Sequence, residues 1–328
     1  MKKRIAIAAG GDSGEYEISV KSAAVVEQQL DRERYEPYVI VFRGKEWTWT
    51  SPSGDKYQVD KNDFSLDTGS GKVKFDAVFI AIHGTPGEDG KLQGYFDMLG
   101  IPYTTCDQAT SALTFNKYFT NRFISSFDIK LAPSILLYRD RIYNQANILR
   151  VCGLPCFVKP NSGGSSVGIT KVNREEELKR AIDKAFVEDD QVLVEGFIPG
   201  REITCGVITY AGQPRSLPVT EIITENTFFD YEAKYTDGVA DEITPADIPA
   251  DVEQLCRATS EMLYDRLHCF GLVRFDYIFN DDGMFFLELN TVPGLSPNSI
   301  LPQQAEADGI PLKELFSLSL EQALERNS

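Results

Sequence analysis

The pair of strands predicted over residues 272–289 constrains this chain more than any other stretch. Leu272 to Asn280 has the apolar and aromatic pattern of one strand, and Met284 to Leu289 has that of a second. Between them, Asp281-Asp282-Gly283 has the composition of a tight turn. The stretch therefore predicts a β-hairpin.

The polar side chains of this hairpin form a candidate metal site. Glu288 and Asn290 lie on one face, because successive side chains on a strand point to opposite sides, and Asp276 comes from the neighbouring strand. Carboxylate and amide oxygens suit Mg²⁺, which leaves its other positions to water and substrate phosphates. Arg274 shares the face of Asp276, where a cation can steady developing negative charge. Taken alone, the hairpin fits equally well with acids that simply face water.

Composition excludes several classes of protein. The net charge of −16 argues against nucleic-acid binding, which uses basic surfaces. No apolar run approaches the roughly 20 residues of a membrane helix. Only Ile5 to Ala9 follows the basic N-terminus, too short a run for a signal peptide, so we expect a cytoplasmic protein. The six cysteines include no C-x-x-C pair and there are two histidines, which predicts neither a zinc site nor a disulfide framework.

The chain of 328 residues is long enough for two or three domains, and its start predicts a βαβ unit. Arg4 to Ala9 and Tyr38 to Phe42 are predicted strands, with a helix over Ile18 to Leu30 between them. The glycine-rich turn Gly10 to Glu15 would present backbone N–H groups at the helix start. It lacks the G-x-G-x-x-G pattern, so it does not predict dinucleotide binding.

A lone histidine ends another buried strand, Ala77 to Ile82. His83 opens a glycine-rich loop that runs to Gly90, and ligands bind at such strand ends in open α/β sheets. A lone histidine is more often structural, so this is only a candidate site. The polar residues 44–75 predict a small hairpin with no chemistry.

A second glycine-rich loop, Asn161 to Gly168, follows a strand that ends in Lys159. Its glycines and serines supply many donors able to lie against phosphates, although it is not a Walker A loop. Glu195 ends the next strand, and the connection to Glu202 could form an adenine and ribose pocket or be an ordinary crossover. Thr224 to Ala240 is too long and too aromatic for a plain surface loop and predicts a lid.

Taken together, these residues resemble the ATP-grasp fold and, in more detail, the D-alanine–D-alanine ligase family. The resemblance runs from about Ile5 to Leu320 and includes four motifs: Gly10-Gly11-x-Ser13-x-Glu15, His83-Gly84-x-x-Gly87-Glu88-Asp89-Gly90, Tyr231-x-x-Lys234-Tyr235 and Glu288-Leu289-Asn290-Thr291-x-Pro293-Gly294. It implies an α/β protein of three domains: a Rossmann-like substrate-binding domain over 1–108, a central domain over 109–198, and a C-terminal domain over 199–328 that clasps ATP with the central one.

The resemblance also implies a reaction. The carboxylate of one D-alanine attacks the γ-phosphate of ATP to give an acylphosphate, and the amine of a second D-alanine displaces phosphate. The product is D-alanyl-D-alanine, a precursor for peptidoglycan. ATP, two Mg²⁺ (or Mn²⁺) ions and a homodimer are expected.

Each matching position takes a role from the family. The nucleotide is expected to lie against Lys117, Lys159, Glu195, Phe197, Ile198, Glu202, Phe228 and Lys234. Two metal ions are expected on Asp276, Glu288 and Asn290, with Glu288 bridging. The first D-alanine is expected near Glu15, Ser165, Tyr235 and His83, and the carboxylate of the second near Ser299. Arg274 and the backbone N–H of Gly294 would stabilise the oxyanion. Gly196 stands where many members carry Lys or Gln, so backbone atoms are expected to contact adenine there.

Two alternatives remain open on the sequence. One is a related ATP-grasp ligase that makes D-alanyl-D-lactate or another dipeptide; Glu15, His83 and the Lys234-Tyr235 pair favour the D-alanine dipeptide. The other is a non-catalytic nucleotide-binding protein, which would not need the metal carboxylates, lysines and Arg274 together.

Overall fold

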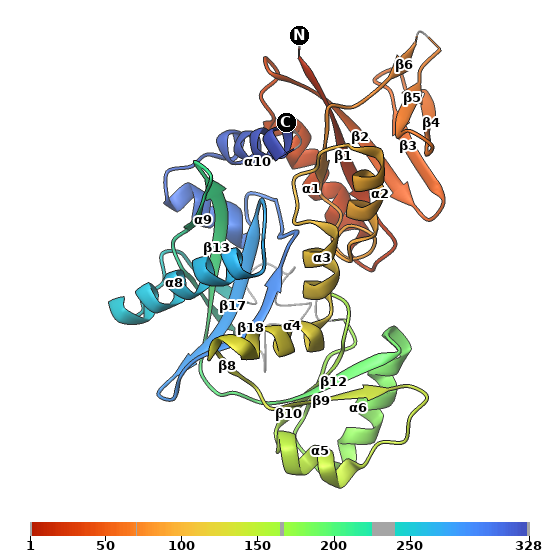
Figure 1. The fold of residues 1–328 in the computed structure, drawn as a ribbon. Coiled ribbons are helices and arrows are strands. Elements are labelled where there is room, and N and C mark those ends of the chain that lie inside the picture. The colour runs from red at the N-terminus through yellow and green to blue at the C-terminus, as the bar shows by residue number, and fades with distance from the viewer. Residues whose placement is uncertain (1, 70, 165–166, 225–239, 327–328) are drawn as a thin grey trace.

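The computed structural model describes residues 2–69, 71–164, 167–224 and 240–326 (Figure 1). Three β-sheets follow one another along the chain, each with helices packed against it. Figure 1 shows the first sheet at one end of the molecule, the second at the other, and the third between them. In the part of the chain that the structure describes, no helix has the length and apolarity needed to cross a membrane.

The first sheet is built on β1 (Lys3–Gly10), which pairs in parallel with β2 (Tyr35–Arg43) and β7 (Ala77–Ile80). Ile5 to Ala9 is completely buried, as expected for a parallel strand covered on both faces. Helix α1 (Tyr16–Gln29) joins β1 to β2, which confirms the predicted βαβ start.

Residues 44–75 differ from the small hairpin predicted for them. They form four strands that extend the first sheet beyond β2: β3 (Glu46–Thr50), β4 (Lys56–Asp60), β5 (Ser65–Asp67) and β6 (Lys72–Val73). Trp47 holds this extension to the rest of the sheet, with ring centroids 4.5 Å from Phe42 and 5.2 Å from Tyr95 of helix α2 (Lys91–Leu99). The extension forms because these aromatic side chains bury one another.

The second sheet has the order β11-β10-β12-β9. Its strands are β9 (Ser134–Tyr138), β10 (Cys156–Pro160), β11 (Thr170–Val172) and β12 (Gln191–Gly196), and helices α5 (Gln145–Cys152) and α6 (Glu175–Glu188) complete its core. Two short helices, α3 (Gln108–Phe115) and α4 (Lys117–Ile124), and a single 3₁₀ turn, η1 (Ser125–Phe127), lead into it.

The third sheet carries the predicted hairpin at its centre, with the order β16-β15-β13-β17-β18-β8 and β14 paired to β13. Its strands are β8 (Lys130–Leu131), β13 (Arg201–Tyr210), β14 (Gln213–Ser216), β15 (Thr220–Thr224), β16 (Ala240–Ile243), β17 (Val273–Asn280) and β18 (Gly283–Asn290). The helices beside it are α8 (Ala250–Arg266), α9 (Ile300–Ala307) and α10 (Leu312–Arg326).

Helix α10 ties the third sheet to the first. Phe316 packs edge-on against Phe79 of β7, with ring centroids 5.5 Å apart. One continuous apolar core includes Ile5 and Phe79 of the first sheet, Ile208 of β13 and Leu320 of α10. The C-terminal helix thus fixes the edge of the first sheet beside the hairpin of the third, which brings distant polar residues together.

Candidate active site

The hairpin of β17 and β18 places four polar side chains opposite one another, two on each strand. Register pairs Asp276 with Glu288 and Arg274 with Asn290. The Arg274 Nε and Nη2 atoms each donate to Asp276 over 2.8 Å. Asp276 is buried, and the Arg274 side chain is 15% exposed. Burial opposes the charge on Arg274, but the Asp276 carboxylate outweighs it and raises the pKa of the guanidinium.

The Asp276 carboxylate accepts four hydrogen bonds. Besides the two from Arg274, the Thr204 hydroxyl donates to Oδ1 over 2.5 Å, and the Asn290 amide donates to Oδ2 over 3.3 Å. Thr204 on β13 is a partner that the sequence did not indicate. Two carboxylates and one amide on facing strands fit a hard cation by donor type. Within the described ranges, no group of three His, Cys, Asp or Glu side chains is placed to hold a metal, so a metal site here would need the Asn290 oxygen as well.

Two of the predicted nucleotide residues form a buried ion pair in the second sheet. Lys159 of β10 and Glu195 of β12 pair directly, and both are 6% exposed. Asn121 of α4 donates to Glu195 Oε1 over 2.8 Å. Asn121 was missed, although it lies four residues after Lys117 and so on the same helix face. Lys117 itself donates to the backbone oxygen of Gly163 in the glycine-rich loop, over 2.6 Å.

Two backbone N–H groups after Glu195 are bonded within the protein. That of Gly196 donates to Pro133, and that of Phe197 donates to Pro155. A backbone contact with adenine at this point would therefore have to use a carbonyl oxygen. A Cβ at position 196 would lie 2.7 Å from the Cys152 carbonyl oxygen, which explains why glycine stands there. Phe197 and Ile198 are half-buried, and Lys171 Nζ lies 4.0 Å from the centroid of the Phe197 ring.

We call Glu15, His83 and Glu88 the acidic corner; they lie where β1 and β7 end. His83 is buried, with Nδ1 2.9 Å from the Val292 carbonyl oxygen and Nε2 2.9 Å from the Ser22 hydroxyl. Burial lowers the pKa of His83. The ring is therefore neutral, with Nδ1 donating to Val292 and Nε2 accepting from Ser22.

Glu88 lies within a motif noted in the sequence but had no predicted role. Its carboxylate accepts from Gly84 N over 2.6 Å and from Val292 N over 3.3 Å. Burial, and then the neighbouring Glu15 carboxylate, raise the pKa of Glu88 to about 8. Glu88 and His83 thus both hold Val292, which follows the metal hairpin in the chain.

Glu15 lies against the glycine-rich loop of the second sheet. A Cβ at Gly164 would lie 2.6 Å from Glu15 Oε2, so the loop backbone approaches this carboxylate closely. In the turn Gly10 to Glu15, the first three backbone N–H groups are bonded within the protein: Gly10 to Ser19 Oγ, Gly11 to Phe42, and Asp12 to Thr85.

Gly294 and Ser299 meet at the start of α9. A Cβ at Gly294 would lie 2.7 Å from Ser299 Oγ, and Ser299 is the residue from which α9 begins. Ser299 and Ser296 share a hydrogen bond of 2.8 Å. The two residues predicted for the oxyanion and for the second carboxylate are therefore neighbours.

Glu202 lies two residues before Thr204 on β13, and so on the sheet face that carries Asp276. Four predicted site residues, and the stretch 225–239 of the predicted lid, lie outside the described residues. These four are Ser165, Phe228, Lys234 and Tyr235.

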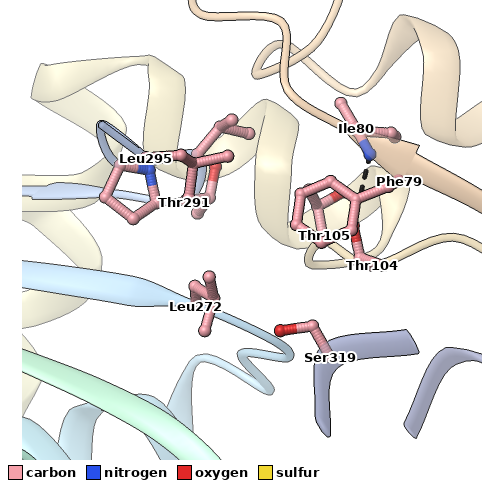
Figure 2. Close-up of a pocket in the computed structure, with 10 residues that line it drawn as sticks. Phe79, Ile80, Thr104, Thr105, Leu272, Thr291, Leu295 and Ser319 are labelled. Carbon is pink, nitrogen blue, oxygen red and sulfur yellow. Dashed lines mark hydrogen bonds between the residues drawn. The ribbon is translucent and has the colours of Figure 1, made fainter. Parts of the chain in front are cut away.

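A cavity lies behind the loop that carries Gly294 (Figure 2). Its walls come from β7, residues 104–105, Leu272, the loop 291–295 and Ser319 of α10. In Figure 2 the Thr104 hydroxyl accepts from Ile80 N over 3.2 Å. None of the predicted site residues lines this cavity.

Comparison with known proteins agrees with this arrangement. Residues 4–106 match the family model of the D-ala D-ala ligase N-terminus, and residues 123–321 match that of the D-ala D-ala ligase C-terminus. A D-alanine–D-alanine ligase of Phocaeicola vulgatus is 44% identical, over 97% of this chain and 98% of its own.

Solved structures are also similar over their whole length. The VanG D-Ala:D-Ser ligase of Enterococcus faecalis has a TM-score of 0.86 at 30% identity, covering 98% of this chain and 100% of its own. A D-alanine–D-alanine ligase of Bacillus anthracis, solved with ATP, has a TM-score of 0.80 at 27% identity, covering 99% and 98%. The fold is that of the ATP-grasp ligases, and this chain belongs to the D-alanine–D-alanine ligase family.

Proposed function

We propose that this chain uses ATP to join two D-alanine molecules into D-alanyl-D-alanine, through an acylphosphate, for cell-wall precursor synthesis. The observation that carries the proposal is the convergence of Arg274, Asp276 and Asn290 on one hairpin, within a chain of this family. Phosphoryl transfer needs charge neutralisation and positioning, and this hairpin offers both.

The nucleotide would lie between the second and third sheets. Lys117 and Lys159 hold the α- and β-phosphates, with the loop around Ser165 over them. Glu195, Phe197, Ile198 and Glu202 form the adenine and ribose pocket, with Phe228 and Lys234 closing it. The Lys159–Glu195 pair supports this assignment, because entry of a phosphate gives the buried lysine a second anion.

Asp276, Glu288 and Asn290 would hold two Mg²⁺ ions, which neutralise phosphate charge when bound. Asp276 already accepts four hydrogen bonds, of which the one from Asn290 is the longest. A cation at this point would replace that bond, so that Asn290 turns its amide oxygen toward the metal. Arg274 holds Asp276 in place through its two hydrogen bonds.

Glu15 would hold the ammonium of the first D-alanine, in a set with Ser165 and Tyr235, and His83 would lie near its carboxylate. That carboxylate attacks the γ-phosphate. Arg274 and the Gly294 N–H stabilise the oxyanion that forms when the second amine adds, and Ser299 receives the second carboxylate.

The alternative concerns the second substrate alone. A structural relative is described as a D-Ala:D-Ser ligase, so the identity of the second substrate needs a direct test. We expect ADP release with D-alanine alone, and mass spectrometry should find the alanine dipeptide in preference to mixed products with D-lactate or D-serine. An Arg274→Ala variant serves as the matched negative control. No ADP release with any of the three would contradict the proposal.

Three further points belong to the proposal. The ranges 1–108, 109–198 and 199–328 act as the three domains, the enzyme works in the cytoplasm where ATP is present, and it forms a homodimer. Light scattering of the purified protein would test the dimer.

A further inference from the structure

Glu242 of β16 lies on the active-site face of the third sheet and has no role in the reaction above. Register aligns Glu242 with Ile222 of β15, and Ile222 with Glu202 of β13. Side chains in register across a sheet share a face. Glu202 in turn shares the face of Thr204, which donates to Asp276. The Glu242 side chain therefore lies on the same face of the sheet as the predicted metal ligand Asp276.

The surroundings of Glu242 lead to the second-substrate position. Gln303 of α9 donates to Glu242 Oε2 over 3.2 Å. Gln303 lies one turn into the helix that begins after Ser299, and its own N–H donates to the Ser299 carbonyl over 3.1 Å. The carboxylate thus lies beside the helix start at which the second D-alanine carboxylate would bind.

Among the described residues, few charges face this carboxylate. β17 presents Arg274, close enough to act on Glu242, and β13 presents Glu202 beyond the neutral Ile222 of β15. From α9 it meets the neutral Gln303. Burial raises the pKa of Glu242, with Arg274 opposing. Such a carboxylate is a stronger base than an exposed one.

We propose that Glu242 receives the ammonium group of the second D-alanine and accepts the proton that this amine must lose before it attacks. The inference rests on the proposed function. Glu15 keeps the first ammonium charged in the acidic corner, whereas the second amine has to be neutral to act as a nucleophile. The arrangement supplies one carboxylate for each amine.

The step balances. One proton passes from the second ammonium to the Glu242 carboxylate, which becomes a neutral acid. The amine lone pair forms the C–N bond with the acylphosphate carbonyl carbon, and the C–O bond to phosphate breaks with its electron pair. The second proton leaves the nitrogen as the amide forms and goes to the departing phosphate, while Glu242 returns its proton to water after product release.

The test compares Glu242→Gln with Asp241→Asn. Glutamine keeps an oxygen that accepts from Gln303 but cannot take the proton. Asp241 is the next residue of the same strand, exposed, and on the opposite face, so its variant controls for loss of one charge. Each variant is assayed with ATP and D-alanine for dipeptide, and separately with hydroxylamine added. Hydroxylamine is an amine that is uncharged at neutral pH, so it can attack the acylphosphate without first losing a proton.

We expect Glu242→Gln to lose about 100-fold in dipeptide formation. Alanine hydroxamate formation should stay within about threefold of wild type, and Asp241→Asn should match wild type in both. Dipeptide formation by Glu242→Gln within about threefold of wild type would overturn the inference. A parallel loss of dipeptide and hydroxamate would also overturn it, because Glu242 would then act on the fold or on the first step. If the wild type forms neither product, the proposed function itself fails.

Discussion

The metal hairpin and the acidic corner hold buried acids in opposite ways. In the hairpin, Asp276 is paired with Arg274, two residues earlier on the same strand, so the negative charge of Asp276 is balanced within the protein. In the acidic corner, Glu88 accepts from two backbone N–H groups, and burial and Glu15 raise its pKa to about 8. The hairpin thus carries its own counter-charge, whereas a positive charge arriving at the corner would be favoured by its acids.

The largest expected effect is on turnover at the hairpin. Glu288→Gln should lower turnover at saturating Mg²⁺ by about 1,000-fold, because the lost carboxylate is the one assigned to both metal ions and each metal contributes several kcal/mol. Asn290→Ala should lose less, since that side chain is assigned to one ion. The measurement is ADP release for both variants and the wild type. Activity of Glu288→Gln near that of the wild type would remove the metal assignment.

The next effect is on stability, again at the hairpin. Asp276→Asn leaves the guanidinium of Arg274 buried with its main counter-charge gone, which should cost about 3–5 kcal/mol in the free energy of unfolding. Urea titration without metal measures this. The double variant Asp276→Asn/Arg274→Met should recover a large part of the loss, because the unbalanced charge is removed as well. A single variant as stable as wild type would mean that the pair is not buried as described.

The hairpin could be predicted from the sequence because it depends only on residues close together in the chain. Alternation along two strands joined by Asp281-Asp282-Gly283 is enough to group Arg274, Asp276, Glu288 and Asn290, and the observed register pairs them. The corner depends on contacts far apart in sequence. His83 and Glu88 both bond to Val292, more than two hundred residues away, and no periodicity predicts such a contact.

Two helices were not predicted, although residues near their ends could have indicated one of them. Helix α3 was not predicted, although Asp107 precedes it and caps it by accepting from Thr110 N over 2.8 Å. Helix α9 was also not predicted. It contains Pro302, which is tolerated because it lies in the first helical turn. The Asn121–Glu195 bond needed the tertiary placement of α4 against the second sheet.

The pH dependence of stability should separate the corner from the hairpin. The folded pKa of Glu88 is raised above that of the unfolded chain, so the folded state binds the extra proton between them. The contribution of Glu88 to the free energy of unfolding is fully present below about pH 4.5. It is lost as pH rises to about 8, at about 1.4 kcal/mol per pH unit. Glu88→Gln should remove this part of the slope in urea titrations at several pH values. Glu306→Gln, an exposed acid on α9, controls for the charge change. Equal slopes in Glu88→Gln and wild type would contradict the account.

The smallest effect tests whether the corner positions the first substrate. Ser22→Ala removes the donor to His83 Nε2, which frees the ring to change tautomer and should cost about 1 kcal/mol of stability. The concentration of D-alanine needed to fill the first site should rise a few fold, with turnover at saturation nearly unchanged. Ser19→Ala is the matched control: Ser19 is buried on the same helix one turn earlier, and its hydroxyl bonds to Gly10 N and Ala81 O without touching His83. It should lose similar stability and leave the D-alanine dependence unchanged. If both variants shift the D-alanine dependence equally, the contact between Ser22 and His83 supports only the fold, and the positioning of the first substrate must come from Glu15 and the glycine-rich loop.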